Sequence, residues 1–359
     1  MPLSLRFPVP RRARIHSSAM LIAAAIASSS LSPPNRPASA ATENHPVYTD
    51  PANVDRDYAI QGEYAGSIDV NGQSIPVAAR VIALGDGRFD VVAYPGGLPG
   101  LGWTGTDRFT GTAARDGDAA DAPVKIAGTD WTGSQRTGVI RNGEIVVLQD
   151  DGSEWTRLPK KARTSPTLGQ TPPDGAVVIF DGPGPVNEAD TLLDAHVSDD
   201  GLLMQGVTTK ETFGDAIWHI EFRLPYQPFD RGQNRGNSGA YVQGCYEVQM
   251  LDSFGLEGEN DECGGLYSIA APRANAALPP LEWQTYDIDF TAPKFADGKK
   301  VAHARMTVRH NGILVQDDVE IPRITPAGPQ SEERPRGPMH LQDHGSQVRY
   351  RNIWVQPKP

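Results

Sequence analysis

Short apolar runs separated by turn residues recur along most of this 359-residue chain. β-branched and aromatic side chains dominate the runs at 81–84, 89–94, 144–148, 305–309 and 313–315. Asn-Gly or Asp-Gly pairs, which supply the positive φ angles of tight hairpin turns, stand at 71–72, 86–87, 142–143, 151–152, 200–201, 297–298 and 311–312. No long stretch repeats apolar residues at helical spacing. The pattern therefore predicts an all-β protein of antiparallel strands.

A polar break divides this pattern into two parts. Residues 164–175 read TSPTLGQTPPDG, a composition typical of a linker. Residues 41–163 before it are expected to form a smaller β-rich accessory domain, in which we find no catalytic pattern. Residues 176–359 after it have the size of a single two-sheet sandwich of the jelly-roll type.

The first 40 residues have the pattern of a secretory signal peptide. Five arginines and no acid occur there, and an apolar run at 19–27 is followed by Ala38-Ser39-Ala40. We therefore expect export to the periplasm or the exterior, with a mature chain from Ala41. No later apolar run is long enough to span a bilayer. The remaining chain has 28 basic and 44 acidic residues, a balance of −16 that excludes nucleic acid as a default partner.

Two cysteines, Cys245 and Cys263, are 18 positions apart. In an oxidising compartment we expect a disulfide between them, with two buried free thiols as the alternative. No zinc-ligand spacing such as Cys-x-x-Cys is present.

The densest polar stretch runs from 230 to 262, and its centre carries candidate catalytic acids. Strand alternation puts Glu247 and Gln249 on one face, and a β-bulge would bring Asp252 to the same face. The spacing E-x-Q-x-x-D is similar to the E-x-D-x-x-E of laminarinase- and lichenase-type glycoside hydrolases. Here an amide replaces the middle acid, which places a retaining carboxylate pair in doubt. The alternative is a polar sheet face that contacts only solvent.

Two further segments carry candidate binding and catalytic groups. Before the acids lie Arg235, Asn237 and Tyr241 among glycines that allow close approach of a ligand. Near the C-terminus His344 follows Gln342 and Asp343 in a polar cluster. The acidic residues at 252–262 form either a solvated loop or a divalent metal site, and their spacing does not match an EF-hand.

Several segments of the second part, taken in order, resemble the 3-keto-disaccharide hydrolase family. They are VIFDG at 178–182, FGD at 213–215, HIEF at 219–222, RGNSG at 235–239, YEVQ at 246–249, LDS at 251–253, CGGLY at 263–267, EWQTY at 282–286, HNG at 310–312, LQDHG at 341–345 and RNIW at 351–354. The resemblance covers residues 177–359. It implies a concanavalin-like or jelly-roll sandwich, an exported setting, and cleavage of glycosides that carry a ketone at sugar carbon 3.

The chemistry of such substrates suits the candidate residues. A 3-keto group acidifies the proton on carbon 2, so a base can remove it and the enolate can expel the glycosidic oxygen, with net hydrolysis or elimination as the outcome. We expect Glu247, Asp252 and His344 to act as the base and acid. The expected substrate-binding residues are Arg235, Asn237, Tyr241, Gln249, Tyr267, Gln342 and Asp343. A divalent metal ion is an alternative group for polarising the ketone.

Two other functions fit the same sequence. A sandwich of this kind can bind small oligosaccharides as a carbohydrate-binding protein of the cell envelope without cleaving them, and it can also be an envelope scaffold. Convergence of the acids and histidine in one pocket would favour the enzyme.

Overall fold

The computed structural model describes residues 45–105, 107–119, 122–184 and 191–359, so the predicted signal peptide lies outside the described residues. Regular structure in these ranges is β, apart from two 3₁₀ turns, η1 (Pro51–Asn53) and η2 (Gly232–Asn234). The all-β prediction is therefore confirmed. No helix in the described ranges has the length and apolar character needed to cross a bilayer.

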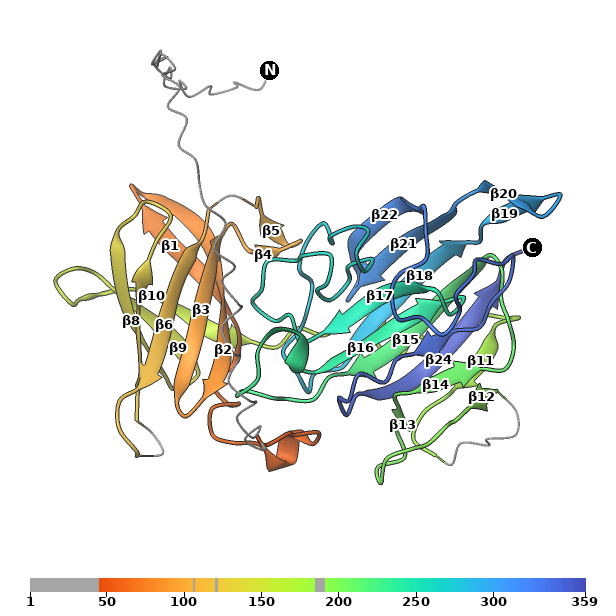
Figure 1. Ribbon diagram of the computed structural model, residues 1–359. Helices are drawn as coiled ribbons and strands as arrows, with labels where there is room; N and C mark the ends of the chain where they lie inside the picture. The colour runs from red at the N-terminus through yellow and green to blue at the C-terminus, as the bar shows by residue number, and fades with distance from the viewer. Residues whose placement is uncertain (1–44, 106, 120–121, 185–190) are drawn as a thin grey trace, which may run out of the picture. The chain divides into compact units, whose positions relative to one another are not determined.

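Eight antiparallel strands of the first part close into a barrel (Figure 1). Their order around the barrel is β1 (Gly62–Val70), β10 (Glu154–Lys161), β9 (Glu144–Leu148), β8 (Gln135–Arg141), β7 (Val124–Thr129), β6 (Phe109–Arg115), β3 (Arg88–Pro95) and β2 (Gln73–Gly85), which pairs back with β1. A short parallel pair, β4 (Leu98–Pro99) and β5 (Gly102–Trp103), follows β3. Closure leaves this sheet without an unpaired edge.

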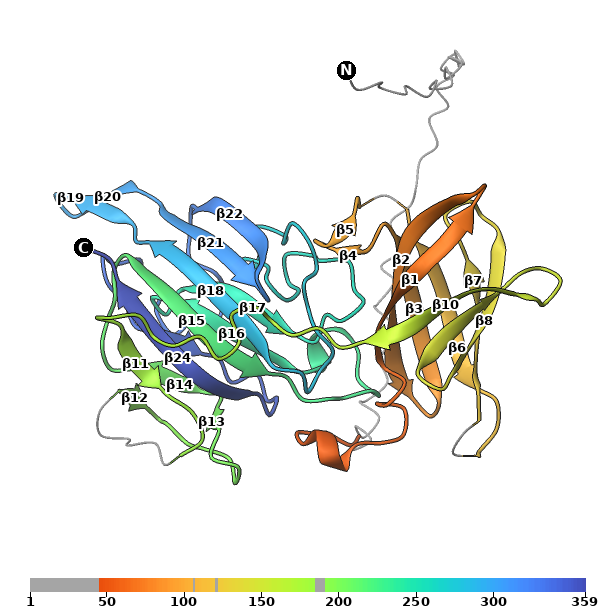
Figure 2. The ribbon, with the colours of Figure 1, turned by 180° about the vertical axis from the view of Figure 1, so that it is seen from behind.

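The second part contains two larger sheets and one small hairpin (Figure 2). The seven-stranded sheet has the order β11 (Val177–Phe180), β24 (Arg349–Pro357), β15 (Ala216–Arg223), β18 (Gln284–Thr291), β21 (Ala304–His310) and β22 (Ile313–Ile321), with β13 (Leu203–Met204) also paired to β24. The five-stranded sheet has the order β12 (Leu192–Leu193), β14 (Val207–Thr209), β23 (His340–Leu341), β16 (Asn237–Val242) and β17 (Tyr246–Leu251). The hairpin consists of β19 (Lys294–Ala296) and β20 (Lys299–Ala302).

Side chains from both large sheets share one hydrophobic core. Phe222 and Ile288 of the seven-stranded sheet belong to it, as do Ala240 and Val248 of the five-stranded sheet. Alternation along each strand explains the arrangement, because every second residue of β16 and β17 points into the core and the residues between them point away. The second part is thus the two-sheet sandwich that the sequence predicted.

A long segment without strands, residues 252–283, covers the outer edge of β17. Its residues 264–267 form backbone hydrogen bonds with β17: Gln249 N–H donates to Gly265 O over 2.9 Å, and Tyr267 N–H donates to Glu247 O over 3.2 Å. The segment therefore satisfies an edge that would otherwise present unpaired backbone groups.

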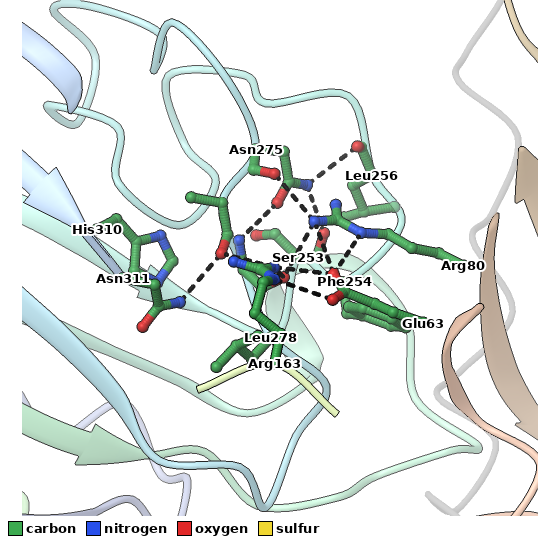
Figure 3. Close-up of polar contacts among 12 residues, drawn as sticks. Glu63, Arg80, Arg163, Ser253, Phe254, Leu256, Asn275, Leu278, His310 and Asn311 are labelled. Carbon is green, nitrogen blue, oxygen red and sulfur yellow. Dashed lines mark hydrogen bonds and ion pairs between the residues drawn. The ribbon is translucent and has the colours of Figure 1, made fainter. Parts of the chain in front are cut away.

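A buried polar cluster, which we call the Glu63 cluster, connects the barrel to this segment (Figure 3). Arg80 Nε and Arg163 Nη2 donate to Glu63 Oε1 over 3.3 and 2.8 Å, and Arg163 Nε donates to Glu63 Oε2 over 2.9 Å. Arg80 Nη2 also donates to the backbone oxygens of Asn275 and Ala277. The two arginines thus tie barrel strands to the backbone of residues 275–277.

Candidate active site

Four polar side chains form a row across the outward face of the five-stranded sheet. The strand registers pair Thr208 with His340, His340 with Tyr241, and Tyr241 with Glu247. Because paired residues of neighbouring strands lie side by side, the four positions follow one line perpendicular to the strands. We call Thr208, His340, Tyr241 and Glu247 the polar row.

Glu247 lies at the end of the polar row and is almost completely buried. Tyr241 Oη donates to Glu247 Oε2 over 2.8 Å. The carboxylate lies over Gly239, since a Cβ atom there would stand 2.2 Å from Glu247 Oε1. A glycine on the paired strand thus provides the space that the buried carboxylate occupies.

The environment of Glu247 favours its neutral form. Burial raises the pKa of Glu247 to about 7, and the hydrogen bond from Tyr241 only partly opposes this. Burial also lowers the pKa of His340, so its imidazole is neutral near pH 7. A carboxyl group with a pKa near 7 can both accept and return a proton under physiological conditions.

A hydrogen bond and a ring contact connect the other members of the polar row. Thr208 Oγ1 and His340 Nδ1 are 2.9 Å apart, and the rings of His340 and Tyr241 are 6.0 Å apart. Gln342 Nε2 donates to Tyr241 Oη over 3.3 Å. His340 and Gln342 are half-buried, so they lie where a ligand can reach them above the buried Tyr241 and Glu247.

Two expected binding residues form an amide network beside the row. Asn237 Nδ2 and Gln249 Nε2 both donate to Gln233 Oε1, over 2.9 and 3.3 Å. Gln249 Nε2 also lies 3.3 Å from the backbone oxygen of Asp261. Asn237 Oδ1 is buried and has no hydrogen-bond partner among the described residues. The structure therefore brings Asn237, Tyr241, Gln249 and Glu247 to one face. The sequence alternation predicted this for Glu247 and Gln249.

Tyr267 reaches the same region from the segment that covers β17. Its backbone N–H donates to Glu247 O, and its phenol is close enough to Tyr241 to raise the pKa of Tyr241 by a small amount beyond the larger effects of burial and Glu247. Gln342 and Tyr267 thus lie beside the polar row, although neither adjoins Glu247 in the sequence.

Asp252 lies away from Glu247. The β16–β17 register has no bulge, and β17 ends at Leu251, so five residues at about 3.3 Å each put Asp252 roughly 16 Å further along the chain. Its carboxylate pairs with Arg235, whose Nη1 is 3.2 Å from Asp252 Oδ2. Arg235 Nη2 donates to Ala83 O of the barrel over 2.8 Å. Arg235 thus contacts the barrel, and neither of these two expected site residues joins the polar row.

The C-terminal candidates are only partly in place. Asp343 and His344 are exposed, and Asp343 Oδ1 accepts from Gly345 N–H within its own turn. The histidine of the polar row is His340, which the sequence analysis did not select. Its signal was present, because His340 and Gln342 alternate on the same face of a strand and His344 follows in a glycine turn. Thr208 and Gln233 were also missed, and no motif marks them.

The expected disulfide is not formed. Cys245 and Cys263 are both buried and free. Cys245 lies immediately before the first residue of β17. Cys263 Sγ lies 3.1 Å from Tyr286 Oη, and this hydroxyl donates to Gln249 O near the other end of β17. The two cysteines therefore lie beside positions of β17 that are four residues, or about 13 Å, apart. This distance is too long for a disulfide. The alternative of two buried thiols is the correct one.

The acidic segment does not fit a metal ion. Within the described ranges no three His, Cys, Asp or Glu side chains are grouped as metal ligands. Glu262 accepts from Gly258 N–H over 2.7 Å, and burial raises its pKa. Asp252 is paired with Arg235 instead.

Part of the chain is similar to proteins of known structure. Among solved structures, one “putative glycosyl hydrolase” from Parabacteroides distasonis is 31% identical, covers 59% of this chain and 97% of its own, and has a TM-score of 0.47. Another of the same description and organism is 18% identical, covers 51% and 99%, and has a TM-score of 0.36. No protein with a curated description matches the chain.

The family comparison covers a larger share of the chain. The model of the 3-keto-alpha-glucoside-1,2-lyase-like domain matches residues 125–356. The match contains all of the polar row and Tyr267, and it begins in barrel strand β7 rather than at the sandwich. With well over half of its length matched, the chain belongs to the 3-keto-alpha-glucoside-1,2-lyase-like domain family, whose members are glycoside-cleaving in type.

Proposed function

We propose that this protein cleaves glycosides whose sugar carries a ketone at carbon 3, with Glu247 as the base that removes the proton on carbon 2. The observation that carries the proposal is the single buried carboxyl group of the polar row, with a pKa near 7. Family membership supports the substrate class. The expected partner is therefore a small 3-keto-oligosaccharide.

Glycosidases that act on unoxidised sugars flank the scissile bond with two carboxyl groups at most about 10 Å apart. Glu247 and Asp252, the two acids expected from the sequence, are separated by roughly 16 Å of extended chain. Elimination beside a ketone does not need this pair, because one base can serve both proton transfers.

In the proposed reaction, Glu247 takes the proton from carbon 2, and the electrons of the broken bond move to the keto oxygen as an enolate. The enolate then re-forms the ketone, makes a double bond between carbons 1 and 2, and expels the glycosidic oxygen. The proton held by Glu247 is the one available to that leaving oxygen. Addition of water across the double bond would complete a net hydrolysis.

Neighbouring groups supply the other requirements of this reaction. Neutral His340 can donate from Nε2 to the keto oxygen when Thr208 donates to Nδ1. Tyr241, held by Glu247, Gln342 and Pro326 O, keeps the base in a fixed position. Asn237 and Gln249 offer amide groups to sugar hydroxyls.

The test is an assay of the chain from Ala41 with 3-keto-trehalose and with trehalose, followed by NMR in heavy water. We expect cleavage of the keto sugar alone, deuterium at carbon 2, and a loss of at least 100-fold in kcat for Glu247→Gln. His344→Ala, which changes an exposed histidine, is the matched control and should keep full activity. Cleavage of plain trehalose, or an active Glu247→Gln variant, would contradict the proposal.

We also propose that the protein acts after export. The support is the basic, apolar and Ala-x-Ala order of residues 1–40. N-terminal sequencing of the protein from cell fractions tests this, and a soluble cell-interior form that begins at Met1 would contradict it.

A further inference from the structure

The closed barrel contains an apolar cavity of about 80 Å³. Inward-facing side chains of several strands line it, among them Ile68, Val77, Ala79, Val91, Ile126 and Ile145. An eight-stranded barrel has an interior that side chains can just fill or that can hold one small ligand. The cavity shows that side chains leave part of this barrel's interior unfilled.

The cavity lies toward one end of the barrel. At the other end large side chains fill the interior, and Tyr64, Phe89 and Val124 have no exposed surface. Toward the cavity end the lining includes small residues, Ala93 further along β3 and Gly138 on β8. The difference in side-chain size accounts for the space.

The rim of the cavity is aromatic and electrically balanced. Trp131 is 38% exposed, and Trp155 also lines the cavity. Arg136 donates to Asp130 Oδ2 over 2.7 Å, and its guanidinium lies 5.3 Å from the centre of the Trp155 ring. Burial acts to raise the pKa of Asp130, but hydrogen bonds from Thr132, Arg136 and Ser134 outweigh it and lower the pKa. The charges at the rim are therefore already paired within the protein.

We propose that the barrel binds the alkyl chain of a single-chain amphiphile, independently of the reaction at the polar row. The apolar lining recognises methylene groups, and the volume suits a short alkyl segment. The polar end of the amphiphile remains in water beside Trp131, because no unpaired charge of Asp130 or Arg136 is left to hold it inside. A sugar is excluded from the cavity itself, since its hydroxyls would be buried without partners.

The probe is 8-bromooctanoic acid, because bromine quenches indole fluorescence on contact and two indoles lie at the rim. We expect saturable quenching in the full chain, and we expect octan-1-ol to reverse it by competition. Replacing both rim indoles, as Trp131→Phe with Trp155→Phe, should remove most of the saturable component.

Two matched variants on strands of the same barrel separate filling of the cavity from general damage. Ala79→Leu adds bulk to the cavity and should raise the melting temperature without probe and abolish saturable quenching. Ala127→Leu makes the same change at an exposed position on β7 and should leave quenching unchanged.

Absence of saturable quenching in the unaltered chain, or quenching that persists in Ala79→Leu, would overturn the proposal. A third arm uses vesicles of phosphatidylcholine with brominated acyl chains. Quenching by the vesicles without quenching by the free probe would assign the rim to a membrane surface and would equally overturn it.

Discussion

Glu221 and Glu247 are both almost completely buried, but their hydrogen bonds give them opposite preferences for charge. Burial acts to raise the pKa of Glu221, but nearby His219 and hydrogen bonds from Asn352, Gly169 and Arg351 outweigh it and lower the pKa to about 2. Glu247 receives one such bond, from Tyr241, and its pKa is about 7. Glu221 is therefore held as a structural anion, whereas Glu247 is left able to exchange a proton.

This contrast predicts that removing the charge of Glu247 stabilises the protein. Its pKa rises from 4.5 to about 7 on folding, so its contribution to stability is complete below pH 4.5 and is lost as the pH rises through 7. Glu247→Gln, neutral at every pH, avoids that loss and should be more stable than the unaltered chain by on the order of 2–3 kcal/mol at pH 8. Urea unfolding at pH 4 and pH 8 measures it.

The expected difference disappears at pH 4, where both proteins carry a neutral side chain at 247. Equal or lower stability of the variant at pH 8 would mean that Glu247 is charged and satisfied. Together with the expected loss of activity, a gain in stability would identify a residue whose buried position serves function at the cost of stability.

At the scale of elements, the 164–175 segment behaves as a strap on the outer face of the seven-stranded sheet. Thr167 Oγ1 donates to Asp287 Oδ2 over 2.7 Å, and Gly169 N–H donates to Glu221 Oε1 over 2.5 Å. His219 Nδ1 lies 2.6 Å from Asp287 Oδ1, and the His219 ring stacks on Trp354. The segment was predicted to be a linker from its composition, and that boundary stays a prediction.

The strap should release in acid. The pKa of Glu221 falls from 4.5 to about 2 on folding, so its contribution is present above pH 4.5 and is lost as the pH falls toward 2. Glu221→Gln should destabilise the protein by on the order of 2–3 kcal/mol at pH 6 and flatten the loss of melting temperature between pH 4.5 and 2. An unchanged acid transition in the variant would assign that transition to other groups.

Local turn chemistry made much of the β-structure predictable. At 71–72, 86–87, 142–143, 297–298 and 311–312, both residues have positive φ and join two paired strands. Alternation also placed Glu247 and Gln249 on one face. Turn conformation and strand alternation depend on residues adjacent in the chain, so both can be predicted from a single sequence.

The failures concern groups that only pairing between distant strands brings together. His340 lies beside Tyr241 because β23 pairs with β16, a register set over 99 positions of chain. His344, which is exposed, and the two separated cysteines show the same limit. Spacing in the sequence does not reveal whether a residue reaches the site, nor which end of β17 each cysteine lies beside. Asp252 was misplaced because the predicted bulge does not occur.

At the scale of the molecule, the barrel and the candidate site are connected through backbone. The Glu63 cluster holds residues 275–277, and Arg80 lies 5.2 Å from the ring of Phe254 near the start of the same segment. Between these two anchors, residues 264–267 pair with β17 and deliver Tyr267 to the polar row. The family match beginning in β7 agrees with a barrel that contributes to the enzyme as more than an attachment.

Arg80→Met tests this connection. The change removes the donors to Asn275 O and Ala277 O from a site with no exposed surface, while Arg163 still pairs with Glu63. We expect a loss of about 2 kcal/mol or more in the free energy of unfolding and a higher KM for the keto sugar, because residues 252–283 lose two anchors. Arg88, on the neighbouring strand β3, forms an exposed ion pair with Asp86. Arg88→Met removes this pair and should change neither the free energy of unfolding nor the KM appreciably. A destabilised Arg80→Met variant with unchanged KM would show that the Glu63 cluster supports the fold alone, whereas a rise in KM at temperatures far below unfolding would show that barrel residues position the substrate site.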